Sequence, residues 1–220
     1  MPRPVRSRRR LQLGAVLLLV GLVLLGYVGW QLVGTSWVSR RAHAAGVEAL
    51  REQWEQGRDH ADVDHHRVLA LVRVPRFGDD VEVPLVEGTS PDDLAAGFGH
   101  VEGTAEPGAR GNLVIAGHRV THGEPLRDMP RLEPGDRVVV ETRTATHTYV
   151  LDTAGDALSV PFTADWVLDA RPRNPDAGGT EPPADAGPRL LTLVTCAELF
   201  HTDQRLVAFG HLVSSTPSVS

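Results

Sequence analysis

Apolar residues form one uninterrupted block near the N-terminus of the 220-residue chain. Residues 11–33 contain no charged side chain, whereas residues 1–10 carry five arginines. A helix over residues 11–33 would measure roughly 34 Å at about 1.5 Å per residue, and the apolar core of a bilayer is roughly 30 Å thick. A cleaved signal peptide, the competing interpretation, has a shorter apolar core. The pattern therefore predicts an uncleaved transmembrane signal-anchor over residues 11–33.

The charges on either side of this block predict its orientation in the membrane. Five arginines precede it, and the first charges after it are Arg40 and Arg41. Positively charged residues are enriched on the cytoplasmic side of membranes. We therefore expect residues 1–10 to form a cytoplasmic basic segment, with the rest of a single-pass protein outside the cell.

A polar segment, residues 34–66, follows the apolar block. Val47, Leu50 and Trp54 are spaced as on one face of a helix, which predicts a helix over about residues 37–56. Gly57 would end that helix. We interpret the whole segment as a juxtamembrane linker that is partly helical.

Within this linker, residues 60–66 read HADVDHH and hold three histidines and two aspartates. These residue types can bind a metal ion. Nothing in the pattern orders them into a coordination shell, so we favour a solvated linker without a metal.

From Arg67 onward, short apolar runs alternate with turn residues. Many short strands with few helices predict an all-β domain with minor helices over residues 67–213, either a closed barrel or a sandwich. Residues 171–188 are rich in Pro, Gly and acidic residues and indicate a loop, and residues 214–220 indicate a disordered tail. The predicted strands before that loop are VLALVRV (68–74), VEVPLV (81–86), NLVIAGH (112–118), RVVVETRT (137–144), ATHTYVLD (145–152) and ALSVP (157–161).

Composition narrows the possible chemistry. The net charge of −6 gives no reason to expect a nucleic-acid partner. All 22 basic residues are arginine, so the chain has no lysine nucleophile. A single cysteine excludes an internal disulfide framework.

That cysteine, Cys196, ends the apolar run at residues 190–194, and Arg205 opens a second run nine residues later. His118 ends the strand-like run at residues 112–116. A thiol needs a base to become a nucleophile, and Cys, His and Arg at strand ends together suggest acyl transfer through a thioester. The other histidines that could serve as the base are His100, His122, His147, His201 and His211.

Three stretches resemble one known family. GNLVIAGHR (111–119), PGDRVVV (134–140) and LLTLVTC (190–196) are similar to segments of the sortases, membrane-anchored cysteine transpeptidases of Gram-positive bacteria. The resemblance covers about residues 67–213. The segment GTAEPGARGN (103–112) looks most like class E members, with class D next.

The resemblance implies a closed eight-stranded β-barrel and assigns His118, Cys196 and Arg205 as catalytic residues. His118 would pair with the Cys196 thiolate as an imidazolium and then protonate the leaving amine as general acid. Arg205 would stabilise the oxyanion of the tetrahedral intermediate or hold substrate carbonyls. We expect no cofactor and no metal.

Three further residues are candidates for substrate binding. Thr195 precedes the cysteine and would contact the substrate. Val101 stands where class E members commonly have a Tyr after Gly-His, a Tyr tied to Ala-containing LAxTG-type substrates. Glu198 stands where many members have a Pro two residues after the cysteine, and it would alter the neighbouring loop.

The resemblance also implies the substrates. Secreted proteins with a C-terminal LPxTG- or LAxTG-type sorting signal would be cleaved between Thr and Gly, and an amine of peptidoglycan or a pilin lysine would accept them.

Two alternative functions remain open. One is an L,D-transpeptidase, which also uses Cys, His and Arg but has a different motif around its cysteine. The other is a non-catalytic β-domain that binds the cell wall.

Overall fold

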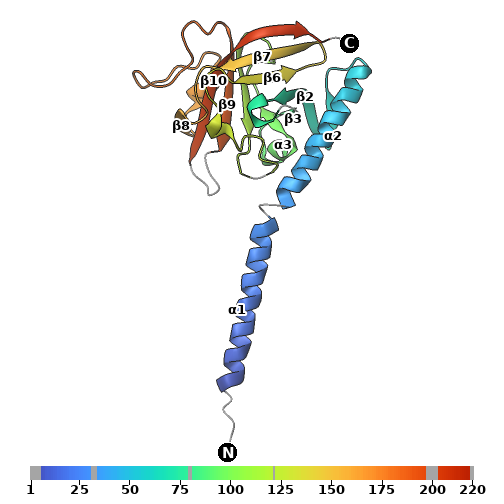
Figure 1. The fold of residues 1–220 in the computed structure, drawn as a ribbon, viewed down its shortest axis with the longest axis vertical. Helices are drawn as coiled ribbons and strands as arrows, with labels where there is room; N and C mark the ends of the chain where they lie inside the picture. The colour runs from blue at the N-terminus through green and yellow to red at the C-terminus, as the bar shows by residue number, and fades with distance from the viewer. Residues whose placement is uncertain (1–5, 31–33, 79–80, 121, 197–202, 219–220) are drawn as a thin grey trace, which may run out of the picture.

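The structure is a computed structural model that describes residues 6–30, 34–78, 81–120, 122–196 and 203–218. A long helix, α1 (Arg6–Gly29), extends away from a compact β-domain, and a second helix, α2 (Thr35–Glu55), lies against that domain (Figure 1). The leucine and valine side chains of α1 are exposed, from 48% for Val20 to 75% for Leu11. Within the described part of the chain, no helix combines the length and the apolar character needed to cross a membrane.

The β-domain begins earlier than the sequence pattern indicated. Residues 60–66, interpreted as solvated linker, contain strand β1 (Ala61–Val63) and the turn into β2 (His66–Arg73), with Val63 paired to His66. The two residues between them, Asp64 and His65, both have positive φ values, 46° and 74°. Such turns match the twist of antiparallel strands. The histidine-rich stretch therefore forms a tight hairpin.

The remaining strands close into a barrel. The hydrogen-bonded order is β2-β3-β4-β5-β9-β10-β7-β6, and β6 pairs back to β2 through Leu71↔Glu141, Val72↔Val140 and Arg73↔Val139. This confirms the predicted closed eight-stranded barrel with few helices. In addition, β1 pairs with β2, and β8 pairs with β10. The strands not yet given are β3 (Glu82–Glu87), β4 (Phe98–His100), β5 (Gly111–Gly117), β6 (Arg137–Glu141), β7 (Ala145–Leu151), β8 (Leu158–Pro161), β9 (Arg189–Cys196) and β10 (Gln204–Pro217).

Short helices fill the connections between strands. Helix α3 (Pro91–Ala96) begins at Ser90, whose hydroxyl accepts a hydrogen bond from the Asp93 backbone N–H. This cap and the Pro at the first helical position favour the start of the helix at this point. The described 3-10 helices are η2 (Pro75–Phe77), η3 (Met129–Arg131) and η4 (Asp165–Leu168).

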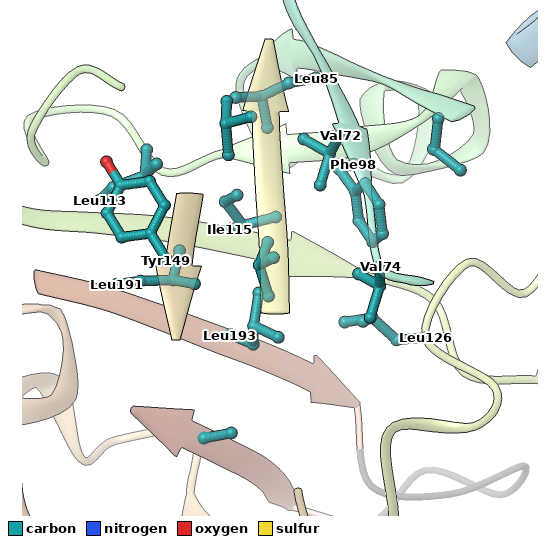
Figure 2. Packing of buried hydrophobic residues seen from close by; sticks show 14 of the residues in the cluster. Val72, Val74, Leu85, Phe98, Leu113, Ile115, Leu126, Tyr149, Leu191 and Leu193 are labelled. Carbon is teal, nitrogen blue, oxygen red and sulfur yellow. The ribbon is translucent and has the colours of Figure 1, made fainter. Parts of the chain in front are cut away.

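Alternation along the strands divides the apolar residues between two faces. Ile115 and Leu193 belong to the core that fills the barrel, together with Phe98 and Tyr149 (Figure 2). Their chain neighbours belong to a second cluster, which therefore lies on the other face of the sheet. Its buried members are Val114, Val160, Val167, Val194, Val207 and Phe209.

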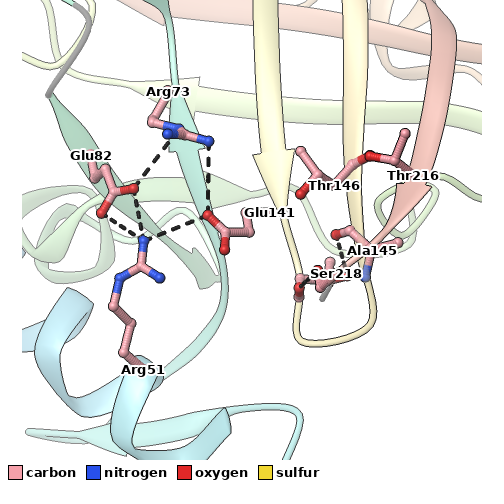
Figure 3. Close-up of polar contacts among 9 residues, drawn as sticks. Arg51, Arg73, Glu82, Glu141, Ala145, Thr146, Thr216 and Ser218 are labelled. Carbon is pink, nitrogen blue, oxygen red and sulfur yellow. Dashed lines mark hydrogen bonds and ion pairs between the residues drawn. The ribbon is translucent and has the colours of Figure 1, made fainter. Parts of the chain in front are cut away.

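Helix α2 packs across the seam where the barrel closes. Leu50 is fully buried in a cluster with residues of β1, β2 and β3. Beside it, Arg51 donates to Glu82 of β3 at 2.8 Å and lies 3.5 Å from Glu141 of β6 (Figure 3). Arg73 of β2 approaches the same two carboxylates. The side chains of α2 thus bridge three strands on both sides of the seam.

Ser214 to Pro217 belong to a strand, which corrects the prediction of a disordered tail over residues 214–220 for this part. Residues 219 and 220 lie outside the described residues. Strand β10 continues to Pro217, and Ser214 to Pro217 pair with Thr148 to Ala145 of β7 after a bulge. The Ser and Thr residues there gave no apolar pattern, because both their faces are largely exposed. Backbone pairing to β7 holds the segment in place.

Truncation of the chain after Val213 should therefore lower its stability. Each backbone hydrogen bond lost from the β7–β10 ladder contributes about 0.5–1.5 kcal/mol, so we expect the free energy of unfolding to fall by roughly 1–3 kcal/mol. Thermal and urea unfolding of the chain in detergent micelles measures the change. A chain ending at Ser218 is the control and should match the full-length protein. Equal stability of the two truncations would contradict the pairing.

Candidate active site

Strand pairing brings the three predicted catalytic residues to one rim of the barrel. Strands β5 and β9 are parallel, so their C-terminal ends lie at the same edge, with Gly117 paired to Thr195. His118 directly follows β5, and Cys196 is the last residue of β9. Strand β10 starts from that edge in the opposite direction, and its Arg205 pairs with Cys196. Residues from positions 118, 196 and 205 therefore occupy neighbouring backbone positions on three adjacent strands.

A buried hydrogen bond fixes this arrangement. The Thr195 hydroxyl donates to the Gly117 carbonyl oxygen at 2.8 Å, and the side chain is buried. The bond ties the residue before Cys196 to the residue before His118. In the structure the Thr195 hydroxyl thus contacts the neighbouring strand β5. A contact of Thr195 with substrate stays a prediction.

A second buried polar group, Asn112, was not singled out from the sequence. Its side-chain oxygen accepts a hydrogen bond from Thr192 at 2.8 Å, and its side-chain nitrogen donates to the carbonyls of Val167 and Asp169. It therefore holds η4 against the β5–β9 pair. An isolated Asn in a strand gives no sequence pattern by which this role could be recognised.

Arg205 is held as a buried cation at the rim. Its side chain is 8% exposed, and its Nη2 donates to the Ala164 carbonyl at 2.8 Å. The guanidinium carbon lies 5.8 Å from the centre of the Phe162 ring. Because a guanidinium does not lose its proton in proteins, Arg205 supplies a fixed positive charge there. Ala164 and Phe162 follow β8, a connection from which the sequence singled out no residue.

His118 is half-buried and sits against a second histidine. Its ring stacks on that of His122 with 4.9 Å between centroids, and its Nε2 is buried without a hydrogen-bond partner among the described residues. Burial, and to a smaller extent the charge of His122, lowers the pKa of His118 to about 4. The imidazole is therefore neutral near pH 7, whereas the sequence led us to expect an imidazolium.

Of the other histidines considered as the base, His122 stacks on His118 at the same rim, and His201 lies outside the described residues. The remaining three have partners elsewhere. The His100 ring lies 3.2 Å from the Ala105 carbonyl, and the His147 ring lies 3.0 Å from the Ser215 hydroxyl. His211 pairs with Asp152 at 2.9 Å, near the opposite end of β9. His118, which directly follows β5, remains the base candidate, with His122 beside it at the rim.

The structure places one of the two remaining substrate-binding candidates. Val101 is partly buried and packs against the cluster of Val114, Val194 and Val207 on the outer face of the sheet. Arg205 lies two residues before Val207 on β10, so strand alternation puts both on that face. Glu198 lies outside the described residues.

An eight-stranded barrel with His, Cys and Arg at adjacent strand ends defines a sortase-type fold and site. Residues 72–213 match the family described as Sortase domain. The chain belongs to the sortase family, whose members are transpeptidases.

Curated relatives support this membership. Sortase SrtE1 of Streptomyces coelicolor is 33% identical over 216 residues, which are 93% of this chain and 57% of that protein. The chain thus spans little more than half the length of that relative. Sortase D of Bacillus subtilis is 28% identical over 140 residues, covering 59% of this chain and 68% of that protein.

Solved structures agree in fold. Sortase E from Streptomyces avermitilis superposes with a TM-score of 0.58 at 37% identity, over 68% of this chain and 90% of that chain. Sortase E1 from Streptomyces coelicolor, determined with a tripeptide in the active site, gives a TM-score of 0.55 at 35% identity with the same coverage.

Replacing His122 should change the protonation of His118. Asn tolerates the positive φ of 56° at position 122, so His122→Asn removes the stacked ring and its charge without forcing the backbone to change. We expect the pKa of His118 to rise from about 4 toward 6.5. NMR titration of the imidazole Cε1–H resonance measures it. His211→Asn, which alters the pair with Asp152, is the control and should leave the pKa of His118 unchanged. An unchanged pKa of His118 in His122→Asn would refute a contribution of His122 to the shift.

Proposed function

We propose that the chain is a membrane-anchored, class E-like sortase. It cleaves a C-terminal LPxTG- or LAxTG-type sorting signal between Thr and Gly, and transfers the protein to an amine of peptidoglycan or to a pilin lysine. The observation that carries this proposal is the register in which Cys196 of β9 pairs with Arg205 of β10, beside the end of β5 that leads to His118.

The first chemical step is attack on the substrate. Neutral His118 accepts the proton of the Cys196 thiol, and the sulfur forms a bond to the carbonyl carbon of the substrate Thr. The carbonyl oxygen becomes an oxyanion. When this intermediate collapses, the C–N bond to Gly breaks, and the amine leaves with the proton that His118 returns. A thioester on Cys196 remains.

The second step reverses these roles. An acceptor amine attacks the thioester carbon and passes a proton to His118, and the Cys196 sulfur leaves and recovers that proton. The pKa of His118, about 4, favours the neutral form that the attack requires. A negative sulfur forming beside the ring would favour the imidazolium only transiently.

Arg205 stabilises the oxyanion in both steps. The bond to the Ala164 carbonyl holds its charged guanidinium in position, so little reorganisation is needed as negative charge develops. Loss of one such donor typically lowers kcat by ~10²–10³. Arg205→Lys would keep the charge but lose the planar geometry of the guanidinium.

Class E character is supported by relatives and bears on the substrate. Sortase SrtE1 and the two sortase E structures are each at least 33% identical to this chain. Val101 stands where class E members commonly have the Tyr that is tied to LAxTG-type substrates. Val101 packs against the outer cluster, on the same face of the sheet as Arg205. We therefore assign the chain either LPxTG or LAxTG, to be distinguished by direct competition of the two peptides.

Helix α1 is proposed as the membrane anchor. Its exposed apolar side chains include Leu11, Leu17 and Leu24. In the sequence the uncharged stretch continues to Val33, beyond the end of α1 at Gly29. The arginines before the stretch favour a cytoplasmic N-terminus, with the barrel outside the cell.

The central prediction concerns Cys196. Incubation with an LPxTG or LAxTG peptide should add the mass of the N-terminal peptide fragment to the protein, and Cys196→Ala should abolish the adduct and all turnover. Because the chain has one cysteine, intact-protein mass spectrometry assigns the adduct without ambiguity. Adding a panel of amines should convert the adduct to amide products. Continued turnover by Cys196→Ala would overturn the mechanism.

The same experiment separates the two alternatives. An L,D-transpeptidase would be acylated by a carbapenem and would ignore both peptides. A non-catalytic wall-binding domain would form no adduct, and its thiol would react with iodoacetamide at the rate of a free thiol at neutral pH.

Anchoring is tested by fractionation. The full chain should remain in the membrane pellet after carbonate extraction and should dissolve in detergent, because buried apolar contacts resist high pH. A chain that begins at Gly34 is the matched control and should be released. Release of the full chain by carbonate would exclude an integral anchor.

A further inference from the structure

Helix α2 touches the loop that leads away from His118. At Gly123, a Cβ atom would lie 2.8 Å from His43 Cε1 and 3.4 Å from Ser39 Cβ, both on α2. Only a residue without a side chain allows this approach. The loop and the membrane-proximal helix are therefore in direct contact, although they are far apart in the sequence.

The backbone of this loop is strained. His122, Gly123 and Glu124 have φ values of 56°, 81° and 53°, three consecutive residues in the left-handed region. Two of them carry side chains, for which this region is costly, and such conformations persist only where the surroundings hold them. A bond from the Leu126 N–H to the His118 carbonyl at 3.0 Å closes the base of the loop. The outer side of the loop is held by α2.

His43 is built into this contact as a packed ring. It is 7% exposed and is hydrogen-bonded to the backbone of Ala95 at the end of α3. Its Nε2 is buried and has no hydrogen-bond partner among the described residues. Burial, with a smaller contribution from the charge of nearby Arg40, lowers the pKa of His43 to about 4, so the ring is neutral at pH 7. The charged groups around it on the loop side are Glu124, Arg127 and Asp128.

The contact at Gly123 lies beside a cavity. This cavity, of about 420 Å³, separates α2 from the following part of the loop, with Arg40 and Ala44 on one side and Pro125 and Arg127 on the other. Ser39 and His43 therefore support Gly123 itself. The residue before Gly123 in the sequence is His122, whose ring stacks on that of His118 with 4.9 Å between centroids.

The other end of α2 is fixed independently of the loop. Leu50 is buried against β-strand residues, and Arg51 is paired with Glu82 across the seam of the barrel (Figure 3). Since these contacts hold the helix on the barrel, its N-terminal half offers a rigid surface. The strained loop adapts to the helix.

We propose that His43 is a positioning residue for the active site: by packing on Gly123 it holds the left-handed turn at residues 122–124, and through the His122 ring it sets the position and solvation of His118. This inference rests on the proposed function only in that His118 is the base. If His43 has this role, helix α2 helps to position the base of the active site.

The test measures His118 directly in the full-length chain in detergent micelles. Using ¹³C-labelled histidine, NMR titration should show the pKa of His118 rising by about one unit in His43→Ala, because the loosened loop admits water to the ring. In peptide transfer, kcat should fall roughly tenfold with little change in KM, since the base is misplaced while the peptide contacts remain. His43→Phe restores the ring shape and should restore both values.

Two further variants isolate the contact. Gly123→Ala disrupts the contact from the loop side and should raise the pKa of His118 as His43→Ala does. If His43→Ala fails to fold, the titration of Gly123→Ala tests the proposal in its place. Val47→Ala is the matched control, because Val47 lies on the same helix but packs against the cluster around Leu50 instead of the loop. It should leave His118 unchanged.

The outcomes separate this inference from the proposed function. If His43→Ala and Gly123→Ala both leave the His118 titration as in the wild type, the positioning role is wrong, whatever the activity. If Val47→Ala shifts His118 equally, the effect is general loss of packing and the role of His43 is also wrong. If the wild type transfers no peptide, the proposed function fails, and the titration still decides the role of His43.

Discussion

The parallel pairing of β5 with β9 is the constraint on which the candidate active site depends. Parallel strands end at the same edge of a sheet, and the 2.8 Å bond from Thr195 to the Gly117 carbonyl fixes the register at that edge. A shift by one residue would invert every side chain of β9 relative to β5 and move Val194 from the outer cluster to the barrel core. The position of Cys196 beside the end of β5 therefore follows from a buried hydrogen bond and two apolar faces.

Charge at the rim is divided between one fixed and one variable group. Arg205 keeps its proton at all accessible pH values and is held by the Ala164 carbonyl. His118 is kept neutral by burial and by His122, with a pKa of about 4. This division suits acyl transfer, in which the base must exchange a proton while the cation faces a transient oxyanion.

The helix that precedes the barrel links its closure to its active site. Arg51 reaches Glu82 and Glu141 on either side of the seam, and Ser39 and His43 reach Gly123 at the loop after His118. One rigid helix thus contacts both the β2–β6 pairing and the strained turn. Because α2 is the next helix after α1 in the sequence, it would connect the proposed membrane anchor to the candidate active site.

The sequence by itself indicated the strand-rich domain and the helix near residues 37–56, because hydrophobic periodicity is a local property. Through the family resemblance, its motifs also singled out His118, Cys196 and Arg205 as candidate catalytic residues. It misjudged residues 60–66 and 214–217, which are held by backbone pairing that leaves no apolar pattern. Only the tertiary structure decided that Thr195 faces a carbonyl, that Asn112 anchors η4, and that His118 is neutral. Each of these depends on which distant segments are neighbours and how much water they exclude, and neither quantity is encoded at any one position of the chain.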